Sequence, residues 1–395
     1  MATGTLQAKS TTGAAPATPA MTQAFRAQTQ PTIKRPGTVL TTPATWPGTT
    51  TAQPLPDTQI PPTTLLRCIY LEATVSWNSS NTADVAYASN GASAAEGALS
   101  FFSTINFHDA QGTSIVGSFD SFTLSMAQKW FGFVNNSDVT NSAVFNASTG
   151  TGAGNLTVVF RIPVEVVMRT GVGSQINTDT QSPLVLSLAV NSPEAIFSTA
   201  PTTEDMTNPQ VVVSYGGYWN QSGNPNSFAT PTAVGTLNYV NWTNYPGLTG
   251  QSQFQLSNLG LGNSVSNILF INRDNTGARS DVTFPSPLQV AYRGVVLGQW
   301  SQLLWKHLMS EAYGFNNPTA EAANGLNTGV YNLWFNQDFT FDPGNSLFYQ
   351  LLNTAVGDSV ELTGSWGTGE TSPSQMYEVI NFLAVSGPVS AIQGH

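Results

Sequence analysis

Apolar and polar residues alternate along two stretches of the chain, and each alternation has the period of a β-strand. In residues 155–164 apolar side chains stand at every second position, and residues 184–190 repeat this pattern. A period of two places each apolar set on one face of a sheet. The intervening positions are only weakly polar. The two stretches are therefore expected to line the middle of a β-sandwich whose outer side is also covered.

Similar apolar runs recur through the rest of the chain. They predict further strands at residues 66–77, 99–108, 115–119, 211–215, 266–272, 329–335, 360–366 and 377–385. Apolar residues three or four positions apart predict helices at residues 121–133 and 294–314. The second helix has the stronger pattern, and Gly314 is a typical stop signal. Residues 216–250 are rich in Asn, Tyr, Trp and Pro and are expected to form a long loop.

The order of these elements divides the chain into segments. Residues 1–62 are rich in Thr, Pro, Ala and Gln without a sustained period, which predicts an N-terminal arm that is extended or disordered in isolation. Residues 199–209 are polar and contain proline, and the strand pattern starts again after them. We therefore predict one β-unit at residues 63–203, a second at residues 204–386 and a loose tail at residues 387–395. Many short strands with long loops favour sandwiches or jelly rolls over βαβ units.

Composition adds an expectation about assembly. Charged residues make up 9% of the 395 residues, against about 25% in a typical soluble protein. Few groups therefore resist burial in a subunit contact, which favours a protein that packs against neighbours. An extracellular β-protein with a neutral surface is the alternative. Cys68 is the only cysteine, and neither a signal-peptide pattern nor a long apolar run is visible, so we expect a soluble chain made in a reducing cytoplasm.

Charge is distributed unevenly along the chain. The formal net charge of −10 argues against nucleic-acid binding by the whole surface. The predicted arm is nevertheless basic, because Lys9, Arg26, Lys34 and Arg35 all precede the first acidic residue, Asp57. Basic segments are attracted to anionic membranes and to acidic protein surfaces. The arm residues are therefore candidates for contact with a membrane or with neighbouring subunits.

Residues that could carry chemistry are few and scattered. His108 stands beside Asp109, His307 lies on the second predicted helix, and His395 ends the chain. None has a second His or Cys at metal-ligand spacing. A catalytic triad is defined by geometry, so His108 is interpreted as a polar residue at the end of a strand. We expect no catalytic residue, no cofactor and no metal.

Taken together, the order of elements resembles a known protein family. A basic arm leads into the strand at residues 66–77, and strands follow at residues 155–163 and 184–191. The second half has a strand and turn at residues 268–275, a long helix, and then Gly329-Val330-Tyr331-Asn332. This order is similar to the double jelly-roll major capsid proteins of tectivirus-like bacteriophages, which are tailless and contain an internal membrane.

The resemblance extends over about residues 20–385 and implies an all-β fold. That fold has two tandem eight-stranded jelly rolls, an added helix and an extended N-terminal arm. The implied function is that of a non-enzymatic major capsid protein, made in the host cytoplasm and located in the virion. Three subunits would form a pseudo-hexagonal capsomer, and capsomers would tile an icosahedral shell over an internal membrane.

The partners implied by the resemblance are further copies of the chain, neighbouring capsomers, and vertex or penton proteins. Lipids of the internal membrane would meet the arm, and no sequence-specific contact with nucleic acid is implied. A different class remains open, namely a secreted or virion-attached carbohydrate-binding β-sandwich protein. The Trp, Tyr and Asn residues of 215–245 favour it. A β-sandwich glycosidase is a third possibility.

Overall fold

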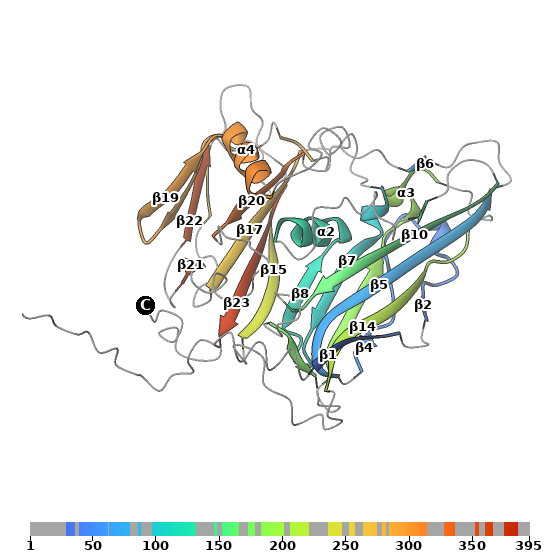
Figure 1. Ribbon diagram of the computed structural model, residues 1–395. Helices are drawn as coiled ribbons and strands as arrows, with labels where there is room; N and C mark the ends of the chain where they lie inside the picture. The colour runs from blue at the N-terminus through green and yellow to red at the C-terminus, as the bar shows by residue number, and fades with distance from the viewer. Residues whose placement is uncertain are drawn as a thin grey trace, which may run out of the picture.

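Two β-sandwiches stand side by side in the computed structural model of the chain (Figure 1). The structure describes residues 29–35, 39–61, 63–79, 86–87, 97–131, 146–147, 152–165, 173–177, 183–200, 206–220, 236–246, 253–256, 264–274, 279–281, 284–313, 328–335, 352–354, 360–365 and 375–385. The N-terminal half of the chain supplies most of the first sandwich, and the C-terminal half supplies the second.

The first sandwich is built on the long strand β5 (Thr63–Ser79). Its seven-stranded sheet contains, in spatial order, β1 (Thr29–Lys34), β14 (Gln210–Asn220), β5, β10 (Gly152–Pro163) and β9 (Asn146–Ala147), while β2 (Val39–Thr41) pairs with β14 and β11 (Gln175–Asn177) pairs with β5. The antiparallel register of β10 on β5 runs from Gly152 opposite Ser79 to Pro163 opposite Cys68. The alternating apolar residues of both strands are buried, as the period of two predicts.

A ten-stranded sheet runs through both sandwiches. Its strands are, in spatial order, β20 (Val330–Trp334), β17 (Ser264–Arg273), β23 (Gln375–Val385), β15 (Thr236–Pro246), β8 (Ser114–Phe119), β7 (Phe102–His108), β12 (Val185–Val190) and β3 (Gln53–Pro54), with β21 (Leu352–Asn353) on β17 and β4 (Thr58–Gln59) on β12. In the described part of the chain, the two halves of this sheet meet through one parallel register pair, Val116 on β8 with Val240 on β15. The facing sheets of the two sandwiches are thereby continuous.

The second sandwich is completed by a four-stranded sheet. Its order is β16 (Gln253–Leu256), β22 (Val360–Ser365), β18 (Leu288–Tyr292) and β19 (Val295–Trp300), so β19 lies at an edge. A two-stranded sheet pairs β13 (Phe197–Thr199) with β6 (Ala86–Tyr87). The helical elements are α2 (Ser121–Trp130), α3 (Pro193–Ile196), α4 (Gln302–Tyr313) and the 3-10 turns η1 (Trp46–Gly48) and η2 (Gly97–Ser100).

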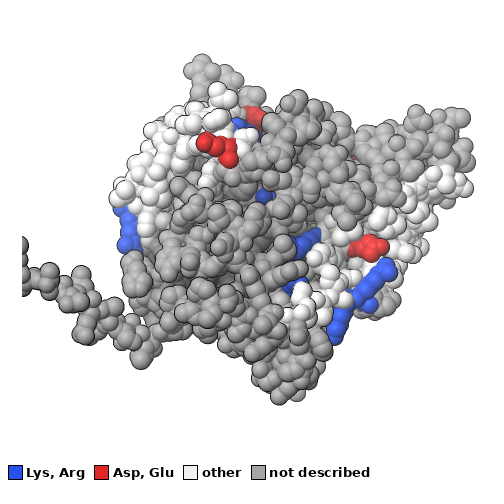
Figure 2. Space-filling model, viewed as in Figure 1, with Lys and Arg blue, Asp and Glu red and all other residues white. Residues whose placement is uncertain are grey.

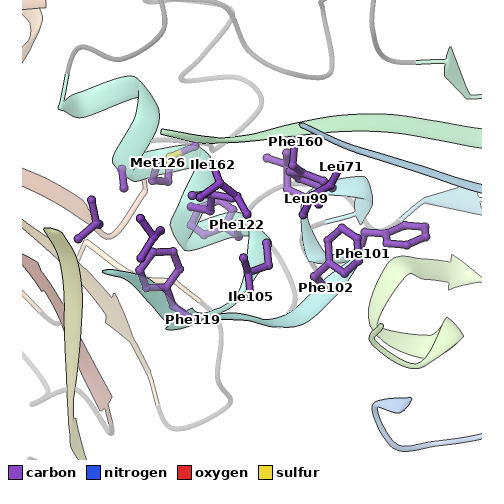
Figure 3. Packing of buried hydrophobic residues seen from close by; sticks show 14 of the residues in the cluster. Leu71, Leu99, Phe101, Phe102, Ile105, Phe119, Phe122, Met126, Phe160 and Ile162 are labelled. Carbon is purple, nitrogen blue, oxygen red and sulfur yellow. The ribbon is translucent and has the colours of Figure 1, made fainter. Parts of the chain in front are cut away.

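Helix α2 is buried along its whole length. Its N-terminus is capped by the Asp120 carboxylate, which accepts a hydrogen bond of 2.6 Å from the Thr123 N–H. Phe122 and Met126 of α2 point into a cluster with Phe119 and Ile162 (Figure 3). Because all faces of α2 are covered, the helix fills the first sandwich beside its junction with the second. One apolar core extends through both sandwiches.

The structure confirms most predicted strands and, over Ser121–Trp130, the helix predicted at residues 121–133, and it corrects two other predictions, a loop and the start of a helix. Residues 216–250 contain part of β14 and the whole of β15, so the expected long loop is wrong there. The strand at residues 210–220 pairs with β5 of the first sandwich, so the predicted boundary near residues 199–209 does not coincide with a change of sheet. Helix α4 begins only at Gln302.

The start of the helix predicted at residues 294–314 is a strand for a local reason. Arg293 and Gly294 both have positive φ angles, of 50° and 75°. Two such residues in succession form the tight turn of a β-hairpin, and here they join β18 to β19. The β-branched Val295 and Val296 that follow favour a strand.

Residues 39–60 of the predicted arm pack against the first sandwich. β2 covers the edge of β14, and β3 and β4 cover the edge of β12 on the facing sheet. Between them Trp46 is fully buried, and its Nε1–H donates to the Asn191 carbonyl at 2.8 Å. Sequence composition did not reveal this role, because the buried residues are isolated among Thr and Pro.

Candidate functional site

A buried ion pair lies within the first sandwich. Arg67 Nε is 2.9 Å from Glu165 Oε2, and the Tyr218 hydroxyl donates to the other carboxylate oxygen. The Glu165 side chain has no exposed surface, and the Arg67 guanidinium lies 4.9 Å from the centre of the Tyr218 ring. Burial, and then the adjacent Glu165, raise the pKa of Tyr218, so its hydroxyl stays protonated. Each group is engaged by the others, which is typical of a structural cluster.

A second polar cluster connects α4 to the second sandwich. Asp281 Oδ1 accepts from the Gly329 N–H at 2.8 Å and from the Tyr331 hydroxyl at 2.7 Å, and lies 3.3 Å from Lys306 Nζ. Lys306 on α4 also donates to the Val330 carbonyl at 2.9 Å. Burial lowers the pKa of Lys306 to about 8, while Asp281 opposes this shift. The side chain keeps 24% exposure, so solvent moderates both effects.

His108 illustrates why a triad cannot be read from residue types. Its Nε2 is 3.3 Å from Ser187 Oγ, but its Nδ1 is 2.8 Å from the Asp109 backbone carbonyl. The Asp109 carboxylate instead accepts from the backbone N–H groups of Gln111 and Thr113, both at 2.9 Å. The carboxylate therefore shapes the turn after β7 and does not orient the imidazole as a triad requires.

The other two histidines differ in whether the structure describes them. His307 is exposed on α4, with Nε2 4.0 Å from Glu311 Oε2, and His395 lies outside the described residues. Within the described part of the chain, His, Cys, Asp and Glu side chains do not gather in a group of three that could hold a metal. Among these residues, no helix is long and apolar enough to cross a membrane.

The structure describes only two of the four basic residues that the sequence predicted to make contacts from the arm. Lys9 and Arg26 lie outside the described residues. Lys34 ends the edge strand β1, opposite Tyr215 of β14, and Arg35 follows it at 3.6 Å from Glu72. Figure 2 shows charged side chains standing apart among the described residues of this face, with basic groups along the lower right beside an acidic one. Lys34 and Arg35 thus lie at the edge of the first sandwich.

Two apolar surfaces were not predicted from the sequence. The first, called the outer patch, is defined as the exposed apolar residues of two successive elements, Val295, Val296 and Leu297 of β19 and Leu303 and Leu304 of α4. The second, called the edge hollow, is a depression lined by Leu40, Thr58, Gln59, Ile60, Pro61, Val213 and Tyr215 and flanked by the exposed Ile33 and Val39. The predicted stripe at residues 294–314 contained both buried and exposed members, so its spacing alone did not reveal the outer patch.

Comparison with known proteins identifies the fold. The chain matches no known sequence family, and no curated protein matches it. Solved structures do match. The major capsid protein of Sulfolobus turreted icosahedral virus has a TM-score of 0.59 at 13% identity, over 90% of this chain and 97% of that chain. The major capsid protein P2 of bacteriophage PM2 has a TM-score of 0.50 at 8% identity, over 91% and 98% of the two chains.

A subunit of the PBCV-1 virus capsid has a TM-score of 0.52 at 11% identity, over 91% of this chain and 96% of that chain. These three proteins have the double jelly-roll fold. Identities this low bear on the fold alone. The chain is therefore an all-β protein with the double jelly-roll fold, as the resemblance of its element order to the capsid family implied.

Proposed function

We propose that this chain is a viral major capsid protein, a structural subunit of an icosahedral virion. The observation that carries the proposal is the extent of the likeness to capsid proteins, which spans both sandwiches and at least 90% of each chain compared. A likeness confined to one sandwich would fit many unrelated β-proteins. Two sandwiches joined through a continuous sheet are a more specific arrangement.

The finer proposal concerns assembly. Three copies carry six sandwiches and would form a pseudo-hexagonal capsomer, and capsomers would tile the shell over an internal membrane, as in tectivirus-like phages. The low content of charged residues, 9%, supports wide contacts between copies because few charges would be desolvated. Neighbouring capsomers and vertex or penton proteins are the further partners. The basic arm, with Lys9, Arg26, Lys34 and Arg35, would contact membrane lipids or neighbouring subunits.

The proposed role includes neither catalysis nor a cofactor. The polar clusters around Glu165 and Asp281 are engaged in contacts that hold elements together. The carbohydrate-binding alternative is less well supported. The described aromatic side chains of residues 215–245 include Tyr215 and Tyr218, which are buried on β14, and Tyr239, which is half-buried on β15.

Sedimentation of the purified full-length chain tests the proposal. We expect one species of three times the 41.9 kDa chain mass, with a six-lobed outline in electron micrographs. A chain that remains monomeric across a wide concentration range would contradict it. Glycan binding by such a monomer would favour the carbohydrate-binding alternative.

A further inference from the structure

The outer patch has the properties of a surface that is covered in the assembled state. β19 is the edge strand of its sheet, and β18 is its only partner among the described strands. Unpaired backbone groups and exposed apolar side chains on an edge strand favour pairing or packing with another chain. Leu303, in the first turn of the adjacent helix, is 82% exposed. Exposed apolar side chains on an edge strand and on the helix that follows it favour contact with another chain.

Helix α4 presents two different faces. Trp305 and Met309 are buried, and the Trp305 Nε1–H donates to the Asn332 carbonyl at 2.6 Å. Leu303, His307 and Glu311 follow one another at intervals of four residues and share the exposed face. That face is apolar at one end and acidic at the other, and the helical rise separates the two ends by about 12 Å.

The edge hollow offers a complementary surface. The hollow is lined by Val213 and Tyr215 of β14, Leu40 of β2 and residues 58–61, and most of these side chains are apolar. Lys34 lies beside it, opposite Tyr215, and makes no ion pair among the described residues. An apolar depression with an adjacent cation matches the apolar and acidic ends of α4.

The two surfaces lie on different sandwiches. Figure 1 shows β19 and α4 at the upper left, on the second sandwich, and β1, β2 and β4 at the lower right, on the first. They therefore cannot meet within one chain, and a contact between them joins two copies head to tail. Contacts of this heterologous kind close into a ring when the rotation between copies allows it. Arg293, the cation in the turn before β19, lies at the end of that strand away from α4.

We propose that the exposed face of α4, continued by β19, docks onto the edge hollow of a second copy of this chain. Leu303 and Leu304 would cover the hollow, and Glu311 would approach Lys34. The inference rests on the proposed function, because the second copy is the neighbouring subunit of the capsomer. It adds to that function the two surfaces through which the subunits meet.

Cysteine cross-linking of the full-length chain tests the contact. The variant carrying both Leu303→Cys and Val39→Cys should give covalent dimers and trimers under mild oxidation. Each single variant should remain uncross-linked, because the contact is heterologous. The matched control combines Leu303→Cys with Gln111→Cys, an exposed residue of the turn after β7, and should not cross-link. Native Cys68 is buried and is common to all variants.

Each other outcome of this experiment overturns the inference. If the double variant sediments as a trimer but does not cross-link, the proposed function survives and the assigned surfaces are wrong. If Leu303→Cys cross-links alone, α4 faces α4 of the neighbour. If the unmodified chain is only monomeric, the capsomer proposal fails together with this inference.

Charge reversal provides an independent test. Glu311→Lys and Lys34→Glu should each raise the concentration needed for association by about two- to fivefold at low salt. The variant with both changes should recover most of the loss, because the pair is restored with opposite signs. Glu194→Lys, on the exposed side of α3, is the matched control and should have no effect. A double variant that associates no better than the single variants would contradict the contact.

Discussion

At the scale of single residues, Glu165 shows how this charge-poor chain accommodates a buried charge. Its carboxylate has no exposed surface and is held by Arg67 on one oxygen and by Tyr218 on the other. Burying such a pair costs desolvation energy, and removing one partner is costlier still because the remaining charge stays buried. The cluster is therefore expected to be sensitive to the loss of any of its members.

The first prediction concerns the coupling within this cluster. Tyr218→Phe removes a donor to Glu165 and should lower the free energy of unfolding by about 1–3 kcal/mol. Combined with Glu165→Gln, the two changes should be non-additive, with a coupling of about 0.5–3 kcal/mol in urea unfolding. The control pairs Glu165→Gln with Tyr331→Phe, whose hydroxyl contacts Asp281 in the second sandwich. Additivity of the first pair would contradict the prediction.

The second prediction is a loss of stability at alkaline pH. Burial raises the pKa values of both Tyr218 and Tyr331. The neighbouring carboxylate, which is Glu165 for Tyr218 and Asp281 for Tyr331, adds to this shift. Above pH about 10 the unfolded chain releases these protons while the folded chain retains them, so the free energy of unfolding falls as pH rises. Lys306 acts in the opposite sense, because its pKa is lowered to about 8 in the folded chain. Its contribution increases stability between pH about 8 and 10.5.

Urea unfolding from pH 9 to 11 would measure this dependence. The variant Tyr218→Phe with Tyr331→Phe should be less stable at pH 9 but show a flatter decline above pH about 10. The comparison uses the slope of the free energy of unfolding against pH, because its absolute value also reflects the hydrogen bonds that the two substitutions remove. An unchanged slope would show that these two tyrosines do not control the alkaline transition.

At the scale of elements, the N-terminal segment closes an open side of the first sandwich. β2 lies on β14, β3 and β4 lie on β12, and Trp46 is inserted between these contacts. Edge strands that are covered in this way cannot pair with other chains. Residues 29–34, as β1, and residues 39–60 are therefore both part of the fold, although the composition of the segment resembles that of a disordered arm.

The third prediction tests this anchoring. Trp46→Ala should lower the free energy of unfolding by about 3–5 kcal/mol, because it leaves a large cavity between the two edges. Trp46→Phe keeps an aromatic ring but removes the donor to the Asn191 carbonyl, so a smaller loss of about 1–2 kcal/mol is expected. Both are measured at one fixed protein concentration. Equal stability of the two variants would indicate that Trp46 does not anchor the segment.

At the scale of the whole molecule, the two sandwiches share one sheet and one core. Separately folding units at residues 63–203 and 204–386 stay a prediction. The pairing of β14 with β5 places residues 210–220 in the first sandwich. A hydrogen bond also crosses the junction, because the side-chain amide of Asn332 donates to the Trp130 carbonyl at 3.2 Å. The orientation of the sandwiches is thus supported by backbone, apolar and polar contacts.

The fourth prediction concerns the residues before β1. Full-length protein should bind vesicles of anionic lipid at low salt, and deletion of residues 1–28, which removes Lys9 and Arg26, should weaken binding about fivefold for each basic residue lost. Binding should decrease as salt rises. The control variant Lys9→Gln with Arg26→Gln keeps the chain length and should behave like the deletion. Equal binding of all three proteins would contradict a membrane role for these residues.

Local pattern in the sequence determined which segments form most strands, and the resemblance of their order to a known family implied the double jelly-roll fold. The alternation in residues 155–164 and 184–190 is sufficient because burial of one sheet face imposes a period of two on neighbouring residues. The helix at residues 121–133 was likewise predictable from its spacing. The polar clusters were not predictable, because their members are far apart in the chain.

Tertiary structure alone decided which sheet a strand joins and which surface is left uncovered. β14 pairs with β5, which lies more than 100 residues earlier, and nothing within residues 210–220 encodes that partner. Leu303 and Trp305 are two positions apart on one helix, yet the first is exposed and the second is buried under aromatic side chains. The local sequence shows that a residue is apolar. Whether that residue is buried depends on distant chain segments, which contact it only after folding or assembly.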